Sequence, residues 1–301
     1  MIMLNQKIVQ KMSSMELIKK LRESTGSGIV DCKKALSENN NDVDAAVKWL
    51  REKGILKAQK KQDRETNEGV VSFYNNSSNT KFTVCKIKCE TDFVAKNNDF
   101  LDFAQKLSKA IHEKEDINDH GTDQELGSLN INDKQLNDCL TDLISKIGEN
   151  IQIVNYKKYS SETSIFITYL HNKYNSNCSK IGSVVEISTN NVDLALKLID
   201  ELKVIAMQIS AMKPMGIDEN SINSKIIKDE IDIILKQLDN VPDDKKDQII
   251  QGKLNKFLKE NTLLGQALIT DPKKSVSSFL SEISKNNNIS LNITSMDLYT
   301  I

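Results

Sequence analysis

Residue types that commonly carry chemistry are present in this chain, but their spacing supports few catalytic or metal sites. The three histidines, His112, His120 and His171, lie far apart, and none belongs to an HExxH or HxxxH pair. Cys85 and Cys89 would share one face of a predicted strand, yet a zinc site needs further ligands at defined spacing, which the other cysteines do not offer. The sequence therefore predicts no metal site, and we expect buried thiols that act as small hydrophobes.

The only glycine-rich turn, residues 26–28, does not fit a nucleotide site. It lies between two predicted helices, lacks a third glycine and is not followed by Lys-Ser or Lys-Thr. We expect a glycine-assisted helix connection, no bound nucleotide and no cofactor. One enzymatic alternative stays open, a cysteine-dependent enzyme built around Cys89 or Cys32, which predicts a depressed thiol pKa and selective alkylation at one site.

The most informative pair is an acid beside a large aromatic, Asp92 and Phe93, within the segment TDFVAK at residues 91–96. Residues 81–89 are rich in β-branched and aromatic types, which predicts a strand, and apolar residues then recur at helical spacing over residues 98–111. The segment is therefore a tip between two rigid elements. Either Asp92 caps the helix and Phe93 enters the core, which the spacing alone favours, or the two side chains project as a wedge.

The rest of the chain must position this tip, and its pattern predicts an α+β protein. The N-terminal part, residues 1–56, has apolar residues at the spacing of three helices, the third of which we expect to end at Gly54. Residues 57–68 are charged and poor in large apolar side chains, which is typical of a linker.

Two strand-strand-helix units follow the linker, in residues 69–150 and 151–301. The second unit includes a long helix over residues 194–209 and an inserted helical hairpin at about residues 221–260, whose turn we expect at residues 241–243. The pattern predicts a core of two repeated subdomains rather than a single large barrel.

Charge is distributed unevenly along the chain, although the formal net charge is only −1. The first 64 residues hold 14 Lys and Arg against 8 Asp and Glu, which predicts either an acidic partner or a solvated helical surface. A second alternative function is therefore a basic helical RNA-associated adaptor using residues 48–64, whose binding would weaken steeply with salt. The odd number of cysteines without CxxC, and the lack of a run of about 20 apolar residues, predict a cytoplasmic protein that does not span a membrane.

Five ordered motifs closely resemble those of the elongation factor Ts family of bacteria. They are LIKKLRESTGSGIVDCKKAL at residues 17–36, TDFVAK at 91–96, KIGENI at 146–151, AMQISAMKP at 206–214 and GQALITDPKKSV at 265–276. The resemblance covers nearly the whole chain and implies a ubiquitin-associated-like (UBA-like) N-terminal domain, a two-part core with an internal repeat, and an inserted helical hairpin. It also implies a protein that is not an enzyme. Such a protein is a guanine nucleotide exchange factor, which binds the GTPase elongation factor Tu and accelerates release of its GDP.

The resemblance also assigns contacts with that GTPase. The implied set is Thr91, Asp92, Phe93, Val94 and Lys96 for the exchange wedge, Arg22, Ile29 and Val30 for the N-terminal domain, and His171 for the core. Phe93 is expected to enter a pocket of the GTPase, since Phe supplies large apolar contact with few rotatable bonds. Many bacterial members continue into a GEGIEK-like motif and a further helix, whereas this chain ends at Ile301. A heterodimer and a 2:2 assembly containing a homodimer both stay open, and no direct nucleic-acid or membrane partner is implied.

Overall fold

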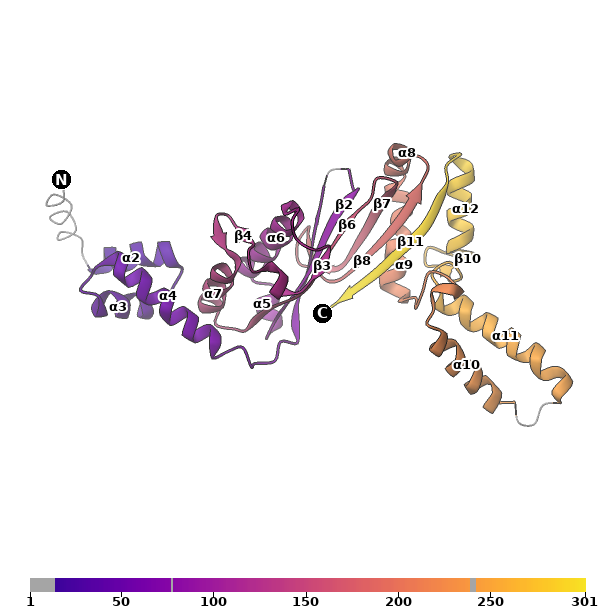
Figure 1. Ribbon diagram of the computed structural model, residues 1–301, viewed down its shortest axis with the longest axis horizontal. Coiled ribbons are helices and arrows are strands. Elements are labelled where there is room, and N and C mark those ends of the chain that lie inside the picture. Colours follow the sequence, from indigo (N-terminus) through magenta and orange to yellow (C-terminus); the bar gives the residue numbers. More distant parts are fainter. Residues whose placement is uncertain (1–13, 77, 239–241) are drawn as a thin grey trace. The chain divides into compact units, whose positions relative to one another are not determined.

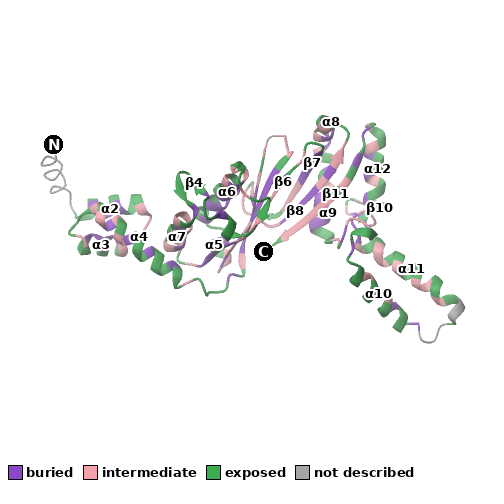
Figure 2. Ribbon diagram, in the orientation of Figure 1, coloured by how far each residue is buried: buried purple, intermediate pink, exposed green. Residues whose placement is uncertain are grey.

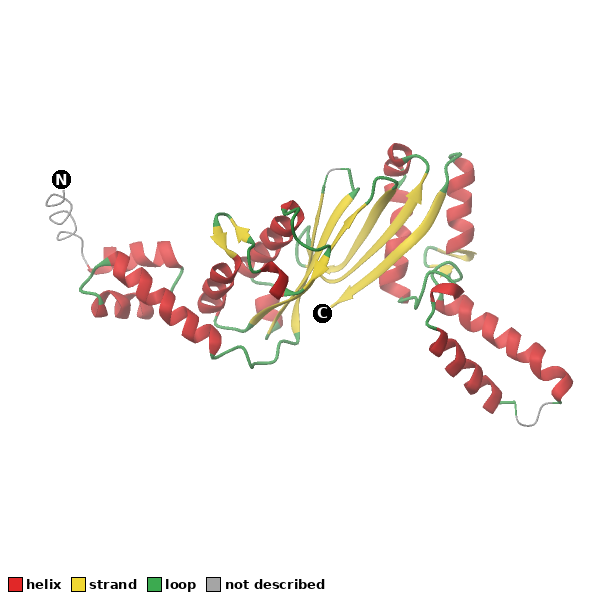
Figure 3. Ribbon diagram, viewed as in Figure 1, coloured by secondary structure: helices red, strands yellow, loops and turns green. Residues whose placement is uncertain are grey.

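The computed structural model describes residues 14–76, 78–238 and 242–301. Helices and strands are both plentiful and are mixed along the chain, so the predicted α+β class is confirmed (Figure 3). The chain divides into two compact units, residues 1–70 with 85–156, and residues 71–84 with 157–301. We call them the first and second units and describe each by itself.

Helices α2 (Ser14–Thr25), α3 (Ile29–Glu38) and α4 (Val43–Gln59) follow one another at the start of the first unit (Figure 1). Asp42 caps α4, because its carboxylate accepts a hydrogen bond of 3.0 Å from the Ala45 N–H. The three helices bury a shared apolar core, as their spacing predicted. Its buried members are Leu17, Ile18, Leu21, Cys32, Ala35, Leu36, Ala46 and Leu50.

The predicted helix stop at Gly54 is wrong, because α4 continues to Gln59 and takes up the start of the expected linker. Gly54 is buried in the middle of α4, where an added Cβ would lie 3.5 Å from the Ser145 side chain of α7 (Leu136–Ile147). The glycine therefore serves close packing of two helices rather than termination. An ion pair between Arg51 and Asp138 joins the same two helices.

The rest of the first unit carries the tip and its supports. Strand β2 (Lys81–Cys89) and helix α6 (Asn98–Glu113) were both predicted. They are joined by the short helix α5 (Asp92–Ala95), which was not predicted as a separate element. Helix α7 ends at Gly148 and is followed by β6 (Ile151–Ser160), a strand that the sequence pattern did not predict. Smaller elements complete the unit: β3 (His120–Gly121), η1 (Asp123–Leu126), β4 (Asn130–Ile131) and β5 (Lys134–Gln135). Strand β1 (Glu68–Asn75) begins in this unit and continues into the second.

The second unit is built on β7 (Ser164–Lys173), β8 (Cys178–Thr189) and β11 (Leu291–Thr300), with β8 paired antiparallel to both neighbours. Helices α9 (Ile199–Met212) and α12 (Val276–Asn286) pack on these strands. Parts of β1, β2 and β6 also belong to this unit, and β1 pairs with β8. Strands β9 (Ala267–Leu268) and β10 (Asp271–Ser275) form a small separate sheet.

The long helix predicted over residues 194–209 is divided into α8 (Val192–Lys197) and α9. The division falls at Leu198, whose backbone has φ −95° and ψ 3°, and whose N–H bonds the Ala195 carbonyl at 3.0 Å. This tight turn interrupts the helix while Leu198 stays buried in the aliphatic core of the second unit. Apolar periodicity continues through the turn, so the pattern alone suggested one helix.

Helices α10 (Ser224–Lys236) and α11 (Asp243–Asn261) follow the short helix η2 (Glu219–Ser221), where a helical hairpin was predicted. Most of their residues are exposed or half-buried (Figure 2). Val241, the first residue of the predicted turn, lies outside the described residues. Among the helices of the described ranges, none is both long and apolar enough to cross a membrane.

Gly148→Ala should lower the free energy of unfolding by about 1 kcal/mol, because Gly148 ends α7 at φ +90°, a conformation that L side chains rarely adopt. The cost is conformational rather than steric, since the nearest atom to an added Cβ is Lys61 Nζ at 3.8 Å. Gly127→Ala is the matched control in the same unit: its φ of −56° suits alanine, so stability should stay equal or rise. Urea unfolding followed by circular dichroism measures both variants, and equal effects would contradict the prediction.

Candidate functional site

The TDFVAK segment forms a tip on which Phe93 is presented to solvent. Thr91, not Asp92, is the N-cap of α5, because the Thr91 hydroxyl accepts a 3.4 Å hydrogen bond from the Val94 N–H. Phe93 is 81% exposed, whereas Val94 and Ala95 beside it are buried. The interpretation of Asp92 as a cap and Phe93 as a core residue is therefore wrong. Burial of the two following residues holds the backbone, and the aromatic ring points outward.

Glu149 holds the base of the tip. Its carboxylate accepts two hydrogen bonds from Thr91, one of 3.0 Å from the backbone N–H and one of 2.7 Å from the hydroxyl. Hydrogen bonds to a charged acceptor are roughly twice as strong as those between neutral groups. The contact joins two motifs that lie far apart in sequence, TDFVAK and KIGENI.

Asn150, which is buried, connects the same turn to two other parts of the first unit. Its N–H donates to Glu90 Oε1 at 2.6 Å, and its side-chain amide donates to the carbonyl oxygens of Gln62 at 3.2 Å and Arg64 at 2.8 Å. Sequence reasoning missed Glu149 and Asn150. The available signal was two polar residues placed directly after a helix-ending glycine and before a strand.

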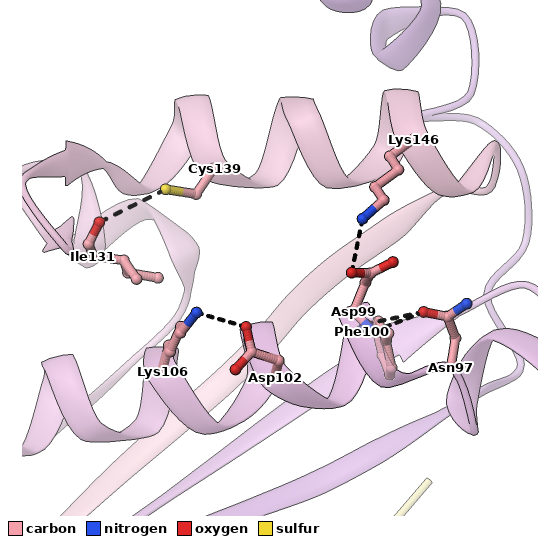
Figure 4. Close-up of polar contacts among 8 residues, drawn as sticks. All are labelled: Asn97, Asp99, Phe100, Asp102, Lys106, Ile131, Cys139 and Lys146. Atoms are coloured by element: carbon pink, nitrogen blue, oxygen red, sulfur yellow. Dashed lines mark hydrogen bonds and ion pairs between the residues drawn. The ribbon is translucent and has the colours of Figure 1, made fainter. Parts of the chain in front are cut away.

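Two partly exposed ion pairs lie on the helices that form and follow the tip. Asp92 and Lys96 are joined at 2.7 Å across one turn of helix. Lys146 on α7 reaches Asp99 on α6 at 2.8 Å, next to Asn97, whose side chain caps α6 (Figure 4). These pairs are partly exposed, so each contributes about 1 kcal/mol or less to stability. The Asp92–Lys96 pair lies on either side of Phe93 in the sequence, so it sets the charges next to that residue along the chain.

The other predicted site residues lie on three elements, α2, α3 and β7. Arg22, Ile29 and Val30 are all exposed and flank one turn, between the last turn of α2 and the first turn of α3. Gly26 in this turn has φ +67°, so it serves as a helix connection. His171 is exposed on β7 of the second unit, with its Nδ1 3.4 Å from the Tyr169 hydroxyl.

The thiols lack the features of reactive cysteines. Cys32, Cys85, Cys89 and Cys178 are buried and Cys139 is half-buried, and all are free thiols. Burial raises the pKa of Cys89 to about 12, with the Glu149 carboxylate adding to the shift, and burial also raises the pKa of Cys32. The cysteine-dependent alternative requires a depressed pKa at one of these two residues and is contradicted.

Metal binding, which was not predicted, and RNA binding, which was an alternative, can also be compared with the structure. Within the part of the chain that the structure describes, no three or more His, Cys, Asp or Glu residues are grouped so that they could hold a metal ion.

In the basic segment proposed for RNA, Arg51 pairs with Asp138, Lys57 with Asp31 and Arg64 with Glu90. The carboxylates partly neutralise the positive side chains that would otherwise bind RNA phosphate groups.

Cys89 should resist alkylation in the folded protein at pH 8 and react only on unfolding, because its thiolate is disfavoured by burial. Cys139, the least buried thiol, is the internal control and should be labelled first. Between pH 9 and 12 the unfolded chain loses a proton that folded Cys89 keeps, so this residue makes stability fall as pH rises through that range. Mass spectrometry after timed iodoacetamide treatment gives the order, and faster labelling of Cys89 would be the contrary result.

Comparison with known proteins assigns the family. The family model described as Elongation factor TS matches residues 90–301, and the model described as Elongation factor Ts, mitochondrial, N-terminal matches residues 1–61. Proteins named Elongation factor Ts from a Nitratiruptor species, from Aquifex aeolicus and from Alkalilimnicola ehrlichii are 38%, 37% and 36% identical to the chain. Each match covers 89% of this chain, and 86%, 92% and 86% of the three relatives respectively. The chain therefore belongs to the elongation factor Ts family of translation elongation factors.

Proposed function

We propose that the chain is a guanine nucleotide exchange factor that binds elongation factor Tu carrying GDP and promotes release of the nucleotide. The observation that carries the proposal is Phe93, an aromatic side chain that is 81% exposed on a tip whose neighbouring residues are buried or hydrogen-bonded. Exposed aromatic rings on rigid supports are typical anchors of protein interfaces. Family membership supports elongation factor Tu as the partner.

Exchange by this route makes and breaks no covalent bond. A protein with this proposed function is therefore not an enzyme and needs no cofactor. A factor that binds the nucleotide-free GTPase more tightly than the GDP form must, by reciprocal linkage, weaken GDP binding by the same factor. We assign Phe93 to displacing a helix of the GTPase and Asp92 to perturbing the charge around its Mg²⁺ and phosphate. On insertion Asp92 would exchange its contact with Lys96 for groups of the partner.

The other assigned residues have different parts in this proposal. Thr91 and Val94 hold the tip in place, because Thr91 is hydrogen-bonded to Glu149 and Val94 is buried. Arg22, Ile29 and Val30 form a second contact with the GTPase, and His171 a third, toward its third domain. Ile29 and Val30 are 54% and 80% exposed, so they can bury apolar surface when the complex forms.

The finer architecture follows the same family assignment. We propose a UBA-like helical domain over residues 1–56, a linker over 57–68 whose first three residues belong to α4, and core subdomains over 69–150 and 151–301, the second with a helical hairpin at about 221–260. We place the protein in the bacterial cytoplasm, where its partner acts. It binds that partner as a heterodimer or as a homodimer within a 2:2 complex.

Phe93→Ala should lower the acceleration of GDP release on the order of thirtyfold, the effect of losing about 2 kcal/mol at an interface anchor. Release of a fluorescent GDP analogue from elongation factor Tu is measured as the factor is titrated in with excess unlabelled GDP. Stability should not change, because the ring is exposed. Leu56→Ala is the control. It truncates an exposed apolar side chain on a different helix, α4, and should keep full activity. Normal release rates with Phe93→Ala would exclude the wedge.

Val30→Asp should raise the factor concentration needed for half-maximal release about tenfold, because a charge enters an apolar contact, while the maximal release rate stays near that of the unmodified protein. Met15→Asp introduces the same charge at another exposed apolar position of the N-terminal helices and should change neither quantity. The full titration curve separates the two quantities. An unchanged half-maximal concentration for Val30→Asp would remove this contact from the proposal.

A further inference from the structure

The contact between Glu149 and Thr91 has a geometry that can fix the orientation of the Phe93 side chain. Thr91 uses its hydroxyl twice, since the hydroxyl donates to Glu149 Oε1 at 2.7 Å and accepts from the Val94 N–H at 3.4 Å. Glu149 therefore fixes the direction of the hydroxyl so that its lone pair faces the first turn of α5. Linked hydrogen bonds of this kind polarise one another.

Helix α5 depends on this support because it is only four residues long. Isolated helices of that length are unstable in water, since nucleation fixes several residues for few hydrogen bonds. Val94 and Ala95 anchor one side of the helix by burial, and the Thr91 cap anchors its start. Phe93 lies between the cap and the buried pair, so its direction follows both.

The Glu149 carboxylate is itself held in place. Glu149 follows Gly148, which ends α7 in the left-handed conformation. It precedes Asn150, whose side-chain amide donates to the Gln62 and Arg64 carbonyl oxygens. Glu149 is half-buried, so its hydrogen bonds are partly shielded from water. The turn is thus a rigid base, and the tip is fixed to it through Thr91.

We propose that Glu149 is a positioning residue for nucleotide exchange, which acts through Thr91 to hold Phe93 in the orientation that enters the GTPase. This inference rests on the proposed exchange function. A pre-organised anchor loses less conformational entropy on binding, so release of the clamp should reduce exchange without removing any atom that touches the partner.

The first measurement is hydrogen exchange of the free protein, read by mass spectrometry on peptides that cover residues 91–96. Glu149→Ala should speed amide exchange there about tenfold or more. The Thr91 N–H and hydroxyl would lose the carboxylate that accepts their hydrogen bonds. Glu149→Gln should have an intermediate effect, since its carbonyl oxygen can still accept from the Thr91 N–H.

Glu125→Ala is the matched control, because Glu125 Oε2 makes the same pair of bonds to another threonine, at 2.7 Å from the Thr122 N–H and 2.8 Å from its hydroxyl. This variant removes an equivalent clamp from a different turn of the first unit. It should leave amide exchange at residues 91–96 and GDP release unchanged.

The second measurement is GDP release with Glu149→Ala, Phe93→Ala and the double variant. Glu149→Ala should lower the maximal release rate about tenfold when Phe93 is present and should have no further effect on Phe93→Ala, because it acts through that ring. The inference is overturned by unchanged amide exchange at residues 91–96, or by an equal loss of release with and without Phe93. If the unmodified protein does not accelerate release, the proposed function fails, and amide exchange alone then decides whether Glu149 holds the tip.

Discussion

The two hydrogen bonds from Thr91 to the Glu149 carboxylate are the contact on which the exposed tip depends. A four-residue helix cannot persist through its own hydrogen bonds, so its geometry must come from outside. Glu149 supplies the acceptor at the start of the helix, and burial of Val94 and Ala95 supplies the rest. An apolar ring can be kept exposed on such a tip because the free energy that orders the backbone comes from neighbouring residues.

The same turn also links the tip to the N-terminal helices. Asn150 bonds the backbone that leaves α4, and Gly54 lets α4 approach α7 closely enough for an added Cβ to touch Ser145. Because α7 ends at Gly148, directly before Glu149, one helix contributes to both contacts. The first unit therefore connects, through side-chain and backbone contacts, the two regions that the proposed function assigns to the GTPase.

Besides the aliphatic core that contains Leu198, the second unit has a separate cluster of aromatic side chains. Phe73, Phe82, Tyr159 and Phe166 form a series of tilted ring contacts 5.1 to 5.7 Å apart. Gly182 makes room for this core, since an added Cβ would lie 2.2 Å from the Phe73 ring. The Tyr159 hydroxyl is bonded to Asp297 and Tyr299 on β11, and burial raises the pKa of Tyr159, so it stays a neutral donor.

The sequence by itself determined the α+β class, most helices and strands, the position of the TDFVAK tip between β2 and α6, and, through five motifs, the family. These features are local, since periodicity and turn residues act over a few positions. Tertiary structure alone decided that Phe93 is exposed, that Thr91 is the cap, that Gly54 packs against α7 and that Glu149 holds Thr91. Gly54 and Thr91 each contact a residue far away in the chain, and burial of Val94 and Ala95 depends on packing that the rest of the fold supplies. Spacing along a sequence carries no information about which distant side chain fills the space beside a residue.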